Sequence, residues 1–180
     1  MEITYILSQI CVAIAYIVLG IGMRKEKRMQ ILIHSNIYNV FLITSYALLG
    51  GISGIISCGL SFLRNFIYMY DEKKNKSTSN IVLIIFAILS IILTIIFYKN
   101  PIDIFPCILT VITIYTVGSR NTKITRCGSL FASVCWIIYA IAFKSWFVIV
   151  CESYLAICTI IGLIKYDLKK ENKKTEATKL

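Results

Sequence analysis

Long apolar runs alternate with short charged blocks along almost the whole chain. Each run approaches the roughly 20 residues that an α-helix needs to cross a hydrocarbon core about 30 Å thick. The runs lack the alternation of a membrane β-strand, so they predict seven transmembrane helices. The second, fifth and sixth runs are short, and we expect their ends to shift by a few residues. The predicted helices span residues 3–23, 31–49, 51–70, 81–98, 102–118, 127–143 and 145–165.

The composition supports a membrane protein over a soluble one. The chain is 58% hydrophobic and 16% charged, whereas about a quarter of the residues of a soluble domain are charged. A net charge of +10 could suit a nucleic acid, but the basic residues border the apolar runs, where membrane topology explains them. We therefore predict a lipid bilayer as the environment and no nucleic-acid partner.

Lysine and arginine are distributed very unevenly between the two predicted sides of the membrane. If the N-terminus lies outside, 17 of the 19 basic residues fall in inner segments, and only Lys99 and Lys144 fall in outer ones. The positive-inside rule then predicts an external N-terminus and a cytoplasmic C-terminus. No basic region precedes the first run and no small-residue cleavage site follows it, which indicates a retained first helix. Residues 169–180 are charged without apolar periodicity and predict a disordered cytoplasmic tail.

The cysteines do not form a recognisable framework. There are seven of them, an odd number without any CxxC spacing, and most lie inside apolar runs, where cysteine behaves as a small hydrophobe. We predict neither disulfides nor a metal site. The chain also contains no phosphate-binding loop or dinucleotide-binding fingerprint, so no cofactor and no ATP-driven pumping are expected.

Weak matches between the two ends of the chain predict an internal repeat. Tyr46 and Tyr139 begin similar triplets, and a cysteine follows each tyrosine twelve residues later, at Cys58 and Cys151. With small gaps, residues 3–70 and 102–165 then form parallel repeats joined by an inverting linker helix, 81–98. The predicted architecture is one all-α transmembrane domain, residues 1–168, with a 3+1+3 arrangement. Parallel repeats of this kind recur in transporters, which bind their substrate between the halves.

Glu152 is the leading candidate for a functional residue. It lies seven residues into the last apolar run, about 10 Å from the outer end of the predicted helix, with Ala156 and Thr159 on the same face. A carboxylate at this depth is costly, so we expect it to face the bundle interior. It would serve either as a solute or proton site or as a structural hydrogen-bonding residue, with Asn39 or Tyr46 as its partner.

Other apolar runs each bring one polar or aromatic face, which predicts an interior suited to a small neutral or zwitterionic solute. The small residues of the third run equally permit close helix packing, and would allow the protein to act alone or as a homo-oligomer. The predicted substrate-binding set is Glu152, Asn39, Trp136, Asn36, Tyr46 and Ser133.

Two further groups have alternative interpretations. Arg64 lies near the inner end of the third run, where its side chain is expected to reach up to the lipid headgroups. His34 and Cys127 both fall near the cytoplasmic face and could form a Cys–His peptidase pair, although neither has an obvious orienting third residue. We therefore do not expect an enzyme.

The chain resembles the YgjV-type bacterial inner-membrane proteins. The resemblance rests on ILSQICVAIAY, LLGGISGIISCGLSFLRN, PIDIFP, KITRC, SVCWIIY and CESYL, in this order over nearly the whole chain. It implies a location in the bacterial inner membrane. A more distant similarity to the SWEET and PQ-loop transporters, which also have three spans, a linker and three more, implies alternating access. The chain lacks a Pro-Gln pair, however, and its first half lacks proline.

These observations favour a small-solute carrier or facilitator with Glu152 at its central site. KDEL receptors share a similar architecture and bind peptides, so the architecture alone does not establish transport. A membrane scaffold, binding protein or receptor is the alternative, and the peptidase is a remote third.

Overall fold

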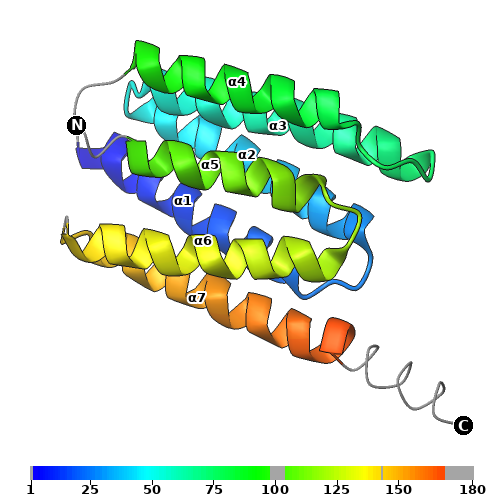
Figure 1. Ribbon diagram of the computed structural model, residues 1–180. Helices are drawn as coiled ribbons and strands as arrows, with labels where there is room; N and C mark the ends of the chain where they lie inside the picture. The colour runs from blue at the N-terminus through cyan, green and yellow to red at the C-terminus, as the bar shows by residue number, and fades with distance from the viewer. Residues whose placement is uncertain (1, 98–103, 143, 169–180) are drawn as a thin grey trace, which may run out of the picture.

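The computed structural model describes residues 2–97, 104–142 and 144–168, and every regular element in them is helical (Figure 1). Each predicted apolar run corresponds to one α-helix. The second and sixth helices begin three and five residues before their apolar runs, because their first turns are polar and extend beyond the apolar stretch. The predicted tail, 169–180, lies outside the described residues. The helices are α1 (Glu2–Met23), α2 (Arg28–Leu48), α3 (Ile52–Lys73), α4 (Asn80–Ile96), α5 (Ile104–Gly118), α6 (Thr122–Ala142) and α7 (Trp146–Gly162), and α7 continues into a π-helical segment, η2 (Leu163–Leu168).

Five of the seven described helices are long and apolar enough to cross a bilayer. They are α1, α2, α3, α6 and α7 together with η2. The other two, α4 and α5, are apolar but shorter, and both adjoin residues 98–103, which the structure does not describe. The prediction of an all-helical membrane protein is therefore confirmed. Of the seven predicted transmembrane spans, five are supported by the length and composition of the described helices.

The helices pack side by side in chain order, and α7 returns to pack against α1 (Figure 1). Consecutive helices run in opposite directions. The α1–α2, α3–α4 and α5–α6 connections and the end of η2 lie at one end of the bundle. We call this the basic end, because these segments are rich in lysine and arginine. The start of α1 and the α2–α3 and α6–α7 connections lie at the opposite end.

Polar side chains concentrate inside the bundle, whereas large apolar side chains cover its outside. A small apolar cluster of Leu19, Met23, Ile31 and Leu155 joins α1, α2 and α7. Exposed isoleucines and leucines occur on every helix, as expected of surfaces that face lipid tails, which cannot hydrogen-bond to polar groups. The buried polar residues are Ser8, Arg28, Asn36, Asn39, Ser45, Arg64, Asn65, Thr78, Ser90, Thr125, Arg126, Ser133, Glu152 and Thr159.

The α2–α3 and α6–α7 turns share two backbone features among their described residues. Gly50 and Lys144 adopt positive φ angles of 69° and 54°. The next residue in each turn, Gly51 or Ser145, donates its backbone N–H over 2.8 Å to a carbonyl five residues earlier. The preceding helices are both 21 residues long. When the two turns are aligned, each position of α3 corresponds to the position 94 residues later in α7. Cys58 then matches Glu152. The sequence comparison had matched it with the neighbouring residue, Cys151.

Candidate functional site

Glu152 lies in the bundle interior, as its place on an apolar helix predicts. Its side chain is 5% exposed, and its Oε1 accepts a 2.7 Å hydrogen bond from the hydroxyl of Tyr16 on α1. The other carboxylate oxygen, Oε2, is completely enclosed and receives no hydrogen bond from any described residue. An enclosed carboxylate oxygen without a donor is costly, so this atom is the natural place for an additional hydrogen-bonding group.

Aromatic and polar groups from α1, α2 and α6 surround this carboxylate, and Cys58 of α3 lies beside one of them. The rings of Tyr16 and Tyr38 pack edge to face, with centroids 5.6 Å apart, and Tyr38 lies close to both Glu152 and Cys58. The buried Ser133 hydroxyl of α6 lies close to the carboxylate. Glu152 of α7 and its positional equivalent Cys58 of α3 therefore both lie close to Tyr38. We call Glu152, Tyr16, Tyr38, Ser133 and Cys58 the central cluster.

The structure brings together only part of the predicted substrate-binding set. Ser133 joins Glu152 in the central cluster, and Asn39 is buried nearby on α2, one residue from Tyr38. Asn39 or Tyr46 was expected to hydrogen-bond to Glu152. This expectation was wrong, because Tyr16 donates the hydrogen bond. Tyr16 was recognisable only as the aromatic residue of a polar face on the first run.

The remaining members of the predicted set make other contacts, although Tyr46 also lies close to Tyr38 and Cys58 of the central cluster. The amide of Asn36 donates to the sulfur of Met69 over 3.6 Å. Trp136 packs against Tyr139 within α6, with ring centroids 5.5 Å apart. Tyr46 is 37% exposed, and its ring lies against Gly54 at the start of α3, where a Cβ would overlap the ring.

A cavity opens at the opposite end of the bundle. Its volume is about 610 Å³. One helical turn further into the bundle, the hydroxyls of Ser8 and Ser45 are hydrogen-bonded at 2.7 Å and buried, which links α1 to α2 below the cavity. The cavity is lined by Glu2, Thr4, Tyr5, Ile6, Leu48 and Leu49.

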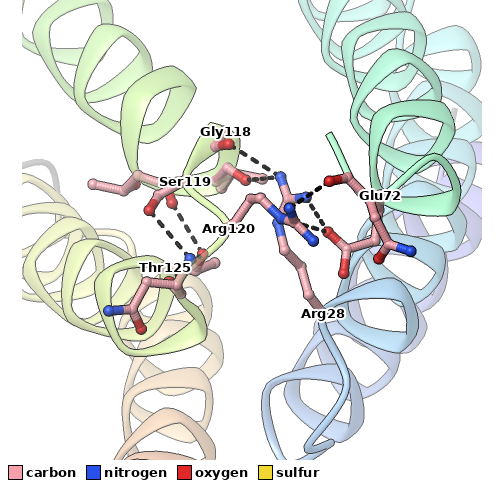
Figure 2. Close-up of polar contacts among 10 residues, drawn as sticks. Arg28, Glu72, Gly118, Ser119, Arg120 and Thr125 are labelled. Carbon is pink, nitrogen blue, oxygen red and sulfur yellow. Dashed lines mark hydrogen bonds and ion pairs between the residues drawn. The ribbon is translucent and has the colours of Figure 1, made fainter. Parts of the chain in front are cut away.

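The basic end is closed by two buried arginines, of which the first is Arg28 at the start of α2 (Figure 2). Its Nη1 forms a 2.7 Å ion pair with Glu72 near the end of α3. Its Nη2 donates to the backbone carbonyls of Val117 and Gly118 at the end of α5, over 3.1 Å each. Arg120 approaches the same carboxylate at 4.0 Å. We call this arrangement the Arg28 clamp; it holds α2, α3 and α5 together.

The second buried arginine, Arg126, makes a corresponding set of contacts from α6. Its side chain has no exposed surface, and its Nη1 contacts Asp167 of η2 at 2.5 Å. Its Nε donates over 3.0 Å to the carbonyl of Met23, the last residue of α1, and its Nη2 donates to the carbonyl of Lys25. Thr122 also donates to Asp167, over 2.9 Å. This Arg126 clamp holds α1, α6 and η2 together.

The two clamps have the same logic. Each arginine lies near the start of α2 or α6, pairs with an acid at the end of the following helix, and bonds carbonyls at the end of a helix from the other half of the chain. Arg126 comes one helical turn later in α6 than Arg28 does in α2. In the sequence, both residues are explained as topology signals alone. Their buried role could have been inferred from the acidic residue, Glu72 or Asp167, at the end of an otherwise apolar helix.

Arg64 contradicts its sequence-based interpretation. The side chain was expected to extend to the lipid headgroups, but it is only 6% exposed and its guanidinium lies over the Tyr68 ring, 5.7 Å from the centroid. Tyr68 is itself fully buried and donates to the carbonyl of Ile114 on α5. The expectation failed because Arg64 lies on the interior face of α3.

His34 and Cys127 do not form a hydrogen-bonded pair. The Nδ1 of His34 bonds the carbonyl of Gln30 in its own helix, and the side chain packs over Gly22 of α1. Cys127 is exposed on α6. The geometry that a Cys–His nucleophile requires is therefore not present between these two described residues.

The fold and the buried polar interior define an integral, polytopic α-helical membrane protein. The chain belongs to the Imp-YgjV family of bacterial inner membrane proteins, whose family model matches residues 6–170. The predicted family resemblance and the bacterial inner membrane as location are thereby confirmed. No curated protein and no solved structure matched the sequence.

Proposed function

We propose that this protein is a carrier or facilitator for a small neutral or zwitterionic solute, with Glu152 at its central binding site. The observation that carries the proposal is the unsatisfied Oε2 of Glu152, an acceptor enclosed within the bundle. A solute hydroxyl, amide or ammonium group would supply the missing donor. Tyr38 and Ser133 lie close to the carboxylate and would contact the rest of the solute.

The proposed 3+1+3 arrangement is supported by three features. The α2–α3 and α6–α7 turns share two backbone features, α2 and α6 have equal lengths, and the two clamps are built alike. In the resulting register, Cys58 and Glu152 occupy equivalent positions, and both lie close to Tyr38. A site shared by both repeats is where transporters with parallel repeats bind their substrates.

Alternating access requires that the two ends open at different times. The basic end, cytoplasmic by the distribution of lysine and arginine, is closed by the Arg28 and Arg126 clamps. At the opposite end, the buried Ser8–Ser45 hydrogen bond lies about one helical turn below the cavity. We infer that solute enters from this cavity, reaches Glu152, and leaves after both clamps have opened.

Thermal stability of the detergent-purified protein provides the first test. A panel of small neutral and zwitterionic solutes is screened at two pH values with the parent, Glu152→Gln and Glu26→Gln. Glu26 is an exposed acid in the α1–α2 connection, so its variant matches the charge change without touching the site. A solute at 100 times its Kd should stabilise the folded state by about 2.7 kcal/mol. We expect a solute that stabilises the parent and Glu26→Gln but not Glu152→Gln.

Uptake into proteoliposomes then tests transport of the solute that the screen identifies. The carrier proposal requires uptake with the parent and Glu26→Gln, and loss of uptake with Glu152→Gln. If no solute stabilises the parent and Glu152→Gln merely lowers the melting temperature, Glu152 is a structural residue. The scaffold or receptor alternative would then take precedence, and affinity capture of a protein partner would be the next experiment.

A further inference from the structure

Arg64 is a buried cation without a counter-charge. It lies on α3 and is 6% exposed, and none of its three guanidinium nitrogens has an ion pair or hydrogen bond to a described residue. The other two buried arginines, Arg28 and Arg126, each bind a carboxylate and two backbone carbonyls. The bundle therefore provides a carboxylate and two carbonyls for two of its buried guanidinium groups, leaving only the Nε of Arg28 without a partner, and it provides neither for the third.

No described acid forms an ion pair with Arg64. On α3, Asp71 and Glu72 lie about two helical turns further along, roughly 10–12 Å along the helix axis, and Glu72 pairs with Arg28. Glu152 accepts its hydrogen bond from Tyr16. The one interaction that Arg64 does make is with the ring of Tyr68, 5.7 Å from the centroid.

This arrangement is unfavourable unless something completes it. Arginine does not deprotonate in proteins, so Arg64 carries its full charge inside the bundle. An interaction with an aromatic face compensates only a fraction of the cost of removing a guanidinium from water. Nε is completely enclosed, so the residual exposure of the side chain belongs to its outer part. The guanidinium is also held in place, because the hydroxyl of Tyr68 is fixed to the Ile114 carbonyl.

We propose that Arg64 is the anchor of a binding site for an oxyanion group, a carboxylate or a phosphate. The planar guanidinium presents parallel N–H groups that match two oxygens of such a group. The group belongs either to a soluble anion or to the headgroup of an anionic lipid. The lysine-rich basic end raises the local concentration of anions from either source.

The Arg64 site is distinct from the proposed solute site. Arg64 lies six residues beyond Cys58 on α3, about 9 Å nearer the basic end along the helix axis. It requires no contribution from Glu152 and would exist whether or not the protein transports a solute. Failure of Glu152→Gln to affect uptake would therefore leave the anion site intact, and the reverse also holds.

Direct binding to the detergent-purified full chain tests the proposal in two arms. In the first, titration calorimetry measures sodium phosphate, acetate and citrate against a chloride reference at constant ionic strength. In the second, native mass spectrometry measures anionic lipid that remains bound after purification. Both arms compare the parent with Arg64→Lys, Arg64→Gln and Lys73→Gln; Lys73 is an exposed cation on the same helix.

We expect anion binding to be lost selectively in the Arg64 variants. Arg64→Gln should weaken binding about tenfold or more, since it removes a charge-assisted hydrogen bond, whereas Lys73→Gln should leave it unchanged. Arg64→Lys keeps the charge and should bind with intermediate affinity. If Arg64→Gln loses binding of a soluble anion, the site binds a solute. If it loses the co-purified anionic lipid, the site binds a lipid headgroup. Equal binding by Arg64→Gln and Lys73→Gln in both arms overturns the proposal.

Stability without any ligand gives an independent readout. Removing an unpaired buried charge should leave the melting temperature of delipidated Arg64→Gln equal to or above that of the parent. A purely structural arginine predicts the opposite, a lower melting temperature or failure to fold, and that result also overturns the proposal.

Discussion

Arg126 and Asp167 form a buried ion pair, with Nη1 and Oδ2 2.5 Å apart, at the end of the bundle where α1, α6 and η2 meet. The same guanidinium donates to the carbonyl of Met23. One side chain thus neutralises a carboxylate in the second half of the chain and satisfies the end of a helix in the first. We expect contacts of this kind to dominate the stability of the basic end.

Replacing Arg126 by methionine should strongly destabilise the protein. The change leaves Asp167 as an unpaired buried carboxylate and removes donors from two helix-end carbonyls, and breaking a buried pair costs about 3–5 kcal/mol. Unfolding in detergent, followed by circular dichroism, measures the loss. Lys73→Met, which removes an exposed cation, should change stability by less than about 0.5 kcal/mol. Equal effects of the two variants would contradict the role of the clamp.

In the Arg28 clamp, the two partners should contribute unequally. Arg28→Gln removes the ion pair and the bonds to the Val117 and Gly118 carbonyls. Glu72→Gln removes the ion pair and the 4.0 Å contact with the half-exposed Arg120, and acts on a side chain that is 23% exposed. We expect Arg28→Gln to cost more. A double-mutant cycle should give a coupling of about 1.5–3 kcal/mol, the usual contribution of a hydrogen bond to a charged group. Strict additivity would show that the pair is not formed.

Two glycines that differ in their surroundings test the packing of α7 on α1. A Cβ at Gly162 would overlap the carbonyl oxygen of Met23, so Gly162→Ala must push the helices apart. The cost of such overpacking is about 1–3 kcal/mol. A Cβ at Gly59, inside α3, meets nothing within 4 Å, so Gly59→Ala should be neutral or stabilise the protein by up to about 1 kcal/mol. Thermal melting of both variants measures the contrast, and destabilisation by both would contradict it.

We expect the hydroxyl of Tyr16 to contribute more to the stability of the protein than its ring does. Tyr16→Phe keeps the edge-to-face contact with Tyr38 but leaves both oxygens of Glu152 without a donor, which should cost about 1–3 kcal/mol. Tyr5→Phe, at a side chain that is 57% exposed, is the matched control and should have no measurable effect. Chemical unfolding of both variants tests this, and a Tyr16→Phe protein as stable as the parent would show that the hydrogen bond contributes nothing.

The sequence located the helices well because their positions follow from a strong physical constraint. An apolar run long enough to cross a bilayer has few alternatives to a helix, and each predicted run corresponds to one helix in the structure. The same argument placed Glu152 inside, since a carboxylate on a lipid-facing surface is costly. Helix ends were less accurate at α2 and α6, because their polar first turns lie outside the apolar pattern.

Side-chain partners were not predictable in the same way. The choice of Tyr16 over Asn39 or Tyr46 depends on the rotation of α1 and α2 relative to α7, which apolar periodicity defines only weakly on helices that are apolar all round. Arg64 was placed toward the headgroups for the same reason. Arg126 was misjudged because a positive charge near a helix end has a simple topological explanation, which hides a buried role.

The Arg126 clamp has a consequence for the order in which the protein is made. The carbonyls of Met23 and Lys25 leave the ribosome early, but the guanidinium that binds them is synthesised about one hundred residues later. Until then the end of α1 must rely on water or on lipid headgroups for its hydrogen bonds. The N-terminal half is therefore inserted in a provisional state, and synthesis of α6 and η2 completes it.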